Sequence, residues 1–132
     1  MQPKTTLTIA SIIGLIFSSA MFLAPEFVTR EQFPNSEGQG FADLVTLRYA
    51  IASIILALVI ISYHLRDITG HAFQIHVMRG YTLAFGVVCI TNLALQLTGK
   101  ISAVPPIVGT GVIAVLSLLT WRRLVSTTKE EA

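Results

Sequence analysis

The sequence predicts an all-α fold, a polytopic membrane protein that forms an antiparallel bundle of four transmembrane helices. Three observations lead to this fold class. Four long apolar runs cover residues 6–24, 44–63, 72–97 and 105–121, and a helix needs about 20 mostly apolar residues to cross a hydrocarbon layer. Charged residues make up only 12% of the 132-residue chain, far below the roughly 25% of a soluble domain. Short connections rich in proline and glycine separate the runs.

The first helix is expected over residues 6–24, and Pro25 ends it. Lys4 followed by an apolar stretch, with Ser18-Ser19-Ala20 as a small-residue site, also resembles a cleaved secretory signal. The apolar run continues through Ala24, which makes it longer than the 7–15 residues of a signal core. We therefore expect an uncleaved membrane helix.

Residues 25–43 are expected to form an outer loop, because Pro34, Asn35, Gly38 and Gly40 disfavour a helix. The loop also holds three phenylalanines that suit the membrane interface, Phe27, Phe33 and Phe41.

The other three helices are bounded by turn residues. Gly70 separates the helices over 44–63 and 72–97, and Gly99 follows the third helix. Pro105 and Pro106 suit the first turn of the helix over 105–121, where missing amide donors cost nothing. Small residues spaced by four, Ala10 with Gly14 and Ser18 and Gly80 with Ala84, predict close helix packing within one bundle or between copies. We expect a single transmembrane domain over residues 1–132.

Basic residues are unevenly divided between the two sides. One side has Lys4, Arg66, Arg79, Arg122, Arg123 and Lys129, and the other has Arg30, Arg48 and Lys100. The richer side is expected in the cytoplasm, together with both termini. The net charge of +2 is spread without a basic stripe, so we expect no nucleic-acid partner.

A candidate ligand site lies near the outer ends of the second and third helices. Arg48 lies one turn inside the outer end of the second helix, and Asn92 and Gln96 lie four residues apart on one face of the third. A hairpin between these helices would bring the three side chains to similar depths, with Asp43 near the mouth. An arginine in an apolar span needs a partner, which is Asp43, an amide, a lipid phosphate or an anionic or carbonyl-bearing ligand.

Three histidines gather at the cytoplasmic side, His64, His71 and His76. Imidazoles bind metals and haem, but His71 and His76 lie about 140° apart around a helix and do not share a face. We expect histidines at the membrane interface and no cofactor, with haem or metal binding as the alternative.

Motifs for enzymes and transporters are missing from the sequence. A lone cysteine, Cys89, cannot form a C-x-x-C redox couple within one chain. The centres of the apolar runs hold no acidic residue, and the chain has no phosphate-binding loop and no H-E-x-x-H motif. We predict no catalytic residue, and we do not expect an enzyme.

The layout resembles small four-span bacterial inner-membrane proteins, including the DoxX-like and related uncharacterised groups. The similarity covers the topology of the whole chain and two short strings, Leu23-Ala24-Pro25 and Leu47-Arg48-Tyr49-Ala50. It implies a multi-pass protein of a bacterial inner membrane rather than a specific activity.

Two functions are expected to compete, and both involve the lipid bilayer. The first is a non-enzymatic subunit or accessory protein of a membrane assembly, packed as a homo-oligomer or in a larger complex. The second is binding or transport of a lipid-like or small anionic molecule between the helices near Arg48. A redox membrane protein that carries haem or a metal on the histidines is a further alternative.

Overall fold

Helices make up nearly all of the structure, a computed structural model that describes the backbone of residues 2–130 and the side chains of residues 2–127. The helices are α1 (Pro3–Leu23), α2 (Pro25–Gln32), α3 (Gly38–Leu65), α4 (His71–Leu97) and α5 (Val104–Glu130). No strand occurs among the described residues. Because α1, α3, α4 and α5 are each long and apolar enough to cross a membrane, the predicted all-α class and the four apolar helices are confirmed.

The prediction of a helix-free outer loop over residues 25–43 is wrong. Residues Pro25–Gln32 form α2, and α3 already begins at Gly38 rather than at residue 44. Proline is tolerated in the first turn of a helix, so Pro25 ends α1 and also begins α2. Glu26 lies in the first turn of α2 and Arg30 in the last, where the helix dipole favours their charges.

The connection from α4 to α5 turns on Gly99, as the sequence predicts. Gly99 has a φ of 70°, a left-handed conformation that glycine adopts without steric cost. Its N–H donates to the Gln96 carbonyl at 3.0 Å, and the Lys100 N–H donates to the Leu95 carbonyl at 3.1 Å. This pair of bonds is a Schellman motif, which satisfies carbonyls at the helix end.

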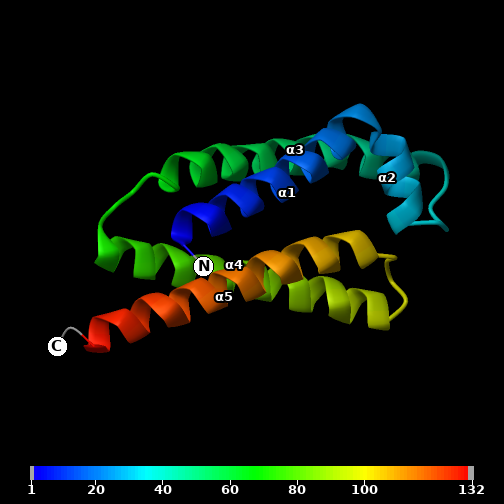
Figure 1. Ribbon diagram of the computed structural model, residues 1–132. Coiled ribbons are helices and arrows are strands. Elements are labelled where there is room, and N and C mark those ends of the chain that lie inside the picture. Colours follow the sequence, from blue (N-terminus) through cyan, green and yellow to red (C-terminus); the bar gives the residue numbers. More distant parts are fainter. Residues whose placement is uncertain (1, 131–132) are drawn as a thin grey trace.

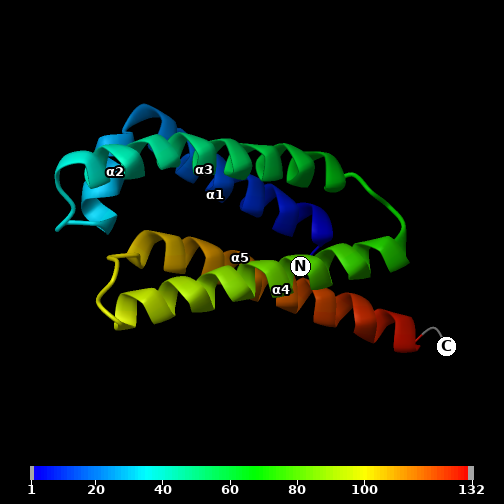
Figure 2. The ribbon, with the colours of Figure 1, turned by 180° about the vertical axis from the view of Figure 1, so that it is seen from behind.

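The four long helices associate as two pairs. α1 packs along α3, α4 packs along α5, and contact between α1 and α5 joins the pairs (Figures 1 and 2). The chain termini and the α3–α4 connection lie toward one end, called the terminal end below (Figure 1). α2 and the α4–α5 connection lie toward the opposite end, called the α2 end. α3 and α4 follow one another in the chain but make little contact along their lengths.

Small side chains and hydroxyl groups mediate the α1–α3 contact. A Cβ on Gly14 would lie 2.6 Å from Cγ2 of Val59, so the two helices approach closely there. The Ser18 hydroxyl donates to the Ala52 carbonyl at 2.9 Å. The predicted stripe of Ala10, Gly14 and Ser18 therefore packs within the chain, as helices in a bilayer commonly do. Gly80 differs, because no atom lies within 4 Å of a Cβ built there.

The two helix pairs also approach closely where α1 meets α5. A Cβ on Gly109 of α5 would lie 2.6 Å from Cε2 of Phe17 on α1. Nearer the terminal end, the buried hydroxyls of Thr6 and Thr120 lie 2.7 Å apart and form a hydrogen bond. Many large apolar side chains face outward instead, such as Ile16, which is 63% exposed. Such a surface favours lipid rather than water around the helices.

Candidate functional site

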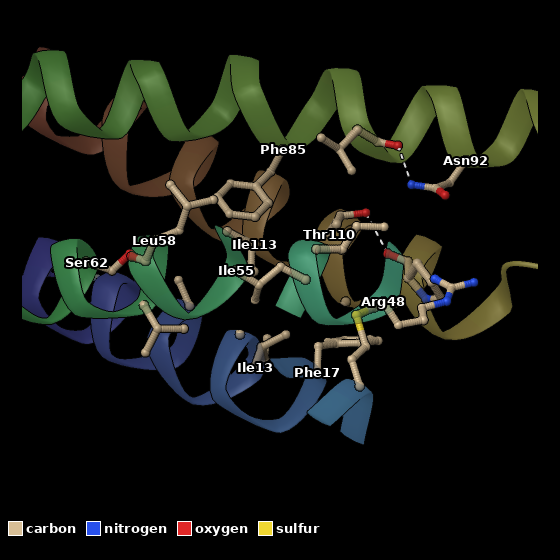
Figure 3. Close-up of a pocket in the computed structure, with 18 of the residues that line it drawn as sticks. Ile13, Phe17, Arg48, Ile55, Leu58, Ser62, Phe85, Asn92, Thr110 and Ile113 are labelled. Atoms are coloured by element: carbon tan, nitrogen blue, oxygen red, sulfur yellow. Dashed lines mark hydrogen bonds between the residues drawn. The ribbon is translucent and has the colours of Figure 1, made fainter. Parts of the chain in front are cut away.

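A cavity of about 320 Å³ lies between the two helix pairs. It extends from Arg48 and Asn92, toward the α2 end, to Ser62, toward the terminal end (Figure 3). Residues from all five helices line it, namely Ala10, Ile13, Gly14, Phe17, Met21, Gln32, Arg48, Ile51, Ile55, Leu58, Val59, Ser62, Phe85, Val88, Asn92, Pro106, Gly109, Thr110 and Ile113. This volume is at the lower end of the range of about 300–1,000 Å³ found for small-molecule pockets.

The lining is polar at one end and mostly apolar elsewhere. Arg48 and Asn92 lie together at the α2 end, whereas Phe85, Leu58 and Ile113 surround the middle (Figure 3). None of the described residues that line the cavity is acidic. An apolar cavity of this kind excludes water and accepts apolar groups, so the arrangement suits a molecule with a polar head and an apolar tail.

Arg48 is the charged group of this cavity. Only 5% of its surface is exposed, although it lies within an apolar helix. Its Nε donates to Oγ1 of Thr29 at 3.3 Å, and its guanidinium lies over the Phe33 ring at 5.5 Å. Its Nη2 is buried without a hydrogen-bond partner among the described residues. A buried charge without a counterion is costly, so this group favours the binding of an acceptor.

The other predicted site residues separate into two sets. Asn92 shares the cavity lining with Arg48, and its amide donates to the Val88 carbonyl at 2.9 Å. Gln96 is not among the lining residues; its Oε1 accepts the Ala103 N–H at 3.2 Å and supports the α4–α5 connection. Asp43 is exposed and accepts a hydrogen bond from Gln39 at 2.8 Å.

The part of the site that α2 supplies was not predicted from the sequence. Thr29 and Phe33 hold the Arg48 guanidinium, and Gln32 lines the cavity. The Gln32 carbonyl also accepts the Ser102 N–H at 2.9 Å, which joins α2 to the α4–α5 connection. The available signal was Pro25-Glu26, which is typical of the first turn of a helix.

The three histidines lie at the terminal end, away from the cavity. His64 is near the end of α3 with its ring edge-on to Tyr63, and His71 begins α4. His76 is exposed on α4. Within the described residues, no group of three or more His, Cys, Asp or Glu side chains could hold a metal ion.

Comparisons with known proteins find no match for this chain among protein-family models, curated proteins or solved structures.

Proposed function

We propose that this chain is a multi-pass membrane protein that binds an amphiphilic molecule between its helices, with the polar head at Arg48 and the apolar tail along the cavity. In this proposal the four long helices form an antiparallel bundle across a bacterial inner membrane, with both termini in the cytoplasm. The bacterial setting is proposed from the resemblance of the sequence to small four-span inner-membrane proteins, and the placement of the termini from the uneven division of basic residues.

The observation that carries the proposal is the buried, incompletely bonded guanidinium at the polar end of an apolar cavity. An arginine at the centre of a bilayer costs about 2.5–3.5 kcal/mol on insertion scales, and this is an upper figure for Arg48 because it lies nearer the α2 end. Thr29 and Phe33 offset part of that cost without neutralising the charge. A head group with acceptor oxygens would bond to Nη2, and hydrogen bonds to charged groups contribute about 1.5–3 kcal/mol each.

The test is to identify what the protein retains when it is extracted gently from its own membrane. Native mass spectrometry would show an added mass, and organic extraction would identify the molecule. Arg48→Leu should reduce retention roughly 10- to 100-fold, the equivalent of one charge-assisted hydrogen bond.

Arg30→Leu is the matched control, because Arg30 belongs to α2 but is exposed and does not line the cavity. It should retain the molecule as wild type does. Circular dichroism and thermal unfolding would establish that both variants fold. An occupied Arg48→Leu variant, or a folded wild type that retains nothing, would refute the proposal.

A second candidate function is the accessory subunit expected from the sequence. The exposed surface of α4 supports it, because Cβ atoms built on Gly80 and Gly86 meet nothing within 4 Å and helices approach closely at such residues. The same native mass spectra would then show a stoichiometric protein partner or a defined homo-oligomer. Gly80→Leu should abolish that species without changing retention of the amphiphile.

A further inference from the structure

We infer that the ligand of this cavity is a single-chain amphiphile with an anionic head, a carboxylate or a phosphate, rather than a neutral lipid or a two-chain phospholipid. This inference rests on the proposed function and specifies its ligand. It follows from the charge and the size of the cavity.

The charge balance of the lining favours an anion. Arg48 supplies a positive charge, and the described lining residues include no carboxylate to balance it. The ion pairs of the described residues join Asp67 with Lys4 and Arg66 at the other end of the molecule, and none includes Arg48. A guanidinium matches two oxygens of a carboxylate or of a phosphate in a bidentate geometry. One anionic head would therefore neutralise the cavity.

The amides at the same end supply further donors. Gln32 and Asn92 both line the cavity with Arg48. The Asn92 amide donates one hydrogen to the Val88 carbonyl and has a second N–H. An anionic head between Arg48 and Asn92 would thus accept hydrogen bonds from both side chains. A hydroxyl head has only one oxygen and would accept fewer of them.

The size of the cavity favours one chain. Along α3 the lining extends from Arg48 to Ser62, which is 14 residues or about 21 Å at 1.5 Å per residue. The volume of about 320 Å³ is at the lower end of the range for small-molecule pockets. A second chain of the same length would double the volume that the ligand needs, so the cavity suits one chain.

The length of the cavity sets an upper limit on the chain. A fully extended backbone advances about 3.3–3.6 Å per three bonds, and a saturated alkyl chain is similar. A path of about 21 Å therefore fits roughly 17–19 bonds. Such a path joins about 17–19 carbons and one head oxygen, so chains of up to about 18 carbons should fit, and chains longer than about 19 carbons should not bind better.

The test uses protein in nanodiscs of zwitterionic phospholipid and competition against radiolabelled hexadecanoate. Hexadecanol keeps the chain and removes the charge, and dihexadecanoyl phosphatidate keeps an anionic head and adds a second chain. Hexadecyl phosphate distinguishes a phosphate from a carboxylate head. Hexadecanoate and hexadecyl phosphate should both compete at least 10-fold better than hexadecanol or the phosphatidate, and the stronger of the two identifies the head group.

Two variants test the ends of the cavity separately. Arg48→Gln should reduce hexadecanoate binding at least 10-fold and leave the weak hexadecanol binding unchanged. Leu58→Trp adds bulk beside the tail and should move the best chain length toward 10–12 carbons, because Leu58 lies about two-thirds of the way along the cavity from Arg48. Arg30→Gln and thermal unfolding serve as the controls for charge and folding.

The outcomes separate this inference from the proposed function. If an amphiphile binds in an Arg48-dependent way but hexadecanol or the phosphatidate competes as well as hexadecanoate, the inference fails and the proposed function stands. If no amphiphile depends on Arg48 for binding, both fail. Preference for hexadecanoate or hexadecyl phosphate, with the chain-length shift in Leu58→Trp, supports both.

Discussion

At the scale of single residues, the surroundings of Arg48 explain how an apolar helix holds a charge before any ligand binds. Thr29 accepts a hydrogen bond from Nε, and the face of Phe33 contributes a cation–π contact. Neither group carries a negative charge. The two contacts orient the guanidinium and leave Nη2 available for an acceptor.

Thr29→Val should destabilise the protein by roughly 1–3 kcal/mol, the cost of leaving a buried donor without a partner. Valine keeps the shape of threonine but cannot accept from Arg48, and Thr29 is fully buried. Thermal unfolding in mild detergent would measure the loss.

Thr46→Val is the matched control on α3. Thr46 is exposed, and its hydroxyl donates to the Ala42 carbonyl four residues earlier, as that of Thr29 does to Pro25. It should change stability by less than about 0.5 kcal/mol. Equal losses in the two variants, or an unchanged effect of Thr29→Val in the Arg48→Leu background, would contradict this account of Thr29.

At the scale of helices, α1 and α5 hold the two pairs together through a glycine. Gly109→Ala would place a methyl group 2.6 Å from Cε2 and 3.1 Å from Cζ of Phe17. Overpacking of this kind costs about 1–3 kcal/mol, which exceeds the gain of up to about 1 kcal/mol when alanine replaces glycine in a helix. We expect a lower unfolding temperature, with Gly86→Ala as a neutral or slightly stabilising control because nothing lies within 4 Å of its Cβ.

Near the terminal end, a hydrogen bond between Ser62 and Tyr81 joins α3 to α4. The Ser62 hydroxyl donates to the Leu58 carbonyl at 2.6 Å, so Tyr81 is the donor to Ser62. Tyr81→Phe removes this bond, which contributes about 0.5–1.5 kcal/mol. The distribution of distances between α3 and α4 should then become broader.

Spin labels at Ile61 and Leu83, which are both exposed, would report those distances by pulsed electron resonance after Cys89 is replaced by alanine. Tyr49→Phe is the control, since its ring contact with Phe22 remains. An unchanged distance distribution in Tyr81→Phe would show that this bond does not restrain α3 relative to α4.

The helices differ in how far the sequence could predict them. The long apolar runs identify α1, α3, α4 and α5, because length and apolar composition alone define a spanning segment. α2 is short and polar, and its first residue, Pro25, is equally typical of the end of α1. Of the site, Arg48 was predictable, because a charged residue within an apolar helix is rare and needs a partner. The position of Gln96 depends on the α4–α5 turn, and the contacts of Thr29 and Phe33 depend on tertiary packing that spacing does not encode.

At the scale of the whole molecule, an ion pair joins the start of α1 to the α3–α4 connection. Nζ of Lys4 lies 2.9 Å from Oδ1 of Asp67. The hydrogen bond from Lys4, with the charges of Lys4 and Arg66, lowers the pKa of Asp67 despite an opposing desolvation effect. Because the pair is exposed, salt screens it, so its contribution should be small and decrease at high ionic strength.

The lowered pKa gives this contribution a defined pH dependence. A carboxyl whose pKa falls on folding stabilises the protein fully above its unfolded pKa of about 3.9. The contribution is lost as the pH falls through the lower, folded pKa. The stability difference between wild type and Asp67→Asn should be constant from about pH 5 to 7 and decrease below about pH 4. Lys4→Gln should reduce it and leave the smaller part that comes from Arg66, and a difference that grows in acid would contradict the assignment.

The two ends of the molecule differ in charge, and this difference predicts its orientation. Lys4, Arg66, Arg122 and Arg123 belong to the terminal end, which both termini share (Figure 1); the side chain of Lys129 lies outside the described residues. The α2 end has acidic residues in and after α2, namely Glu26, Glu31, Glu37 and Asp43. Basic residues beside short loops are retained in the cytoplasm, so the terminal end should face it.

Fusions of alkaline phosphatase, active only outside the cytoplasm, would test this orientation in a bacterial host. A fusion after Ala132 should be inactive and one after Lys100 active. Lys100 precedes α5 and Ala132 follows it, so the two positions should lie on opposite sides of the membrane. Replacing Lys4, Arg122 and Arg123 together by glutamate should produce mixed orientations, since it removes three basic residues from the retained side. Lys100→Glu, on the other side, should leave the orientation unchanged. An active fusion after Ala132 of the wild type would reverse the proposed placement, and the Arg48 end of the cavity would then face the cytoplasm.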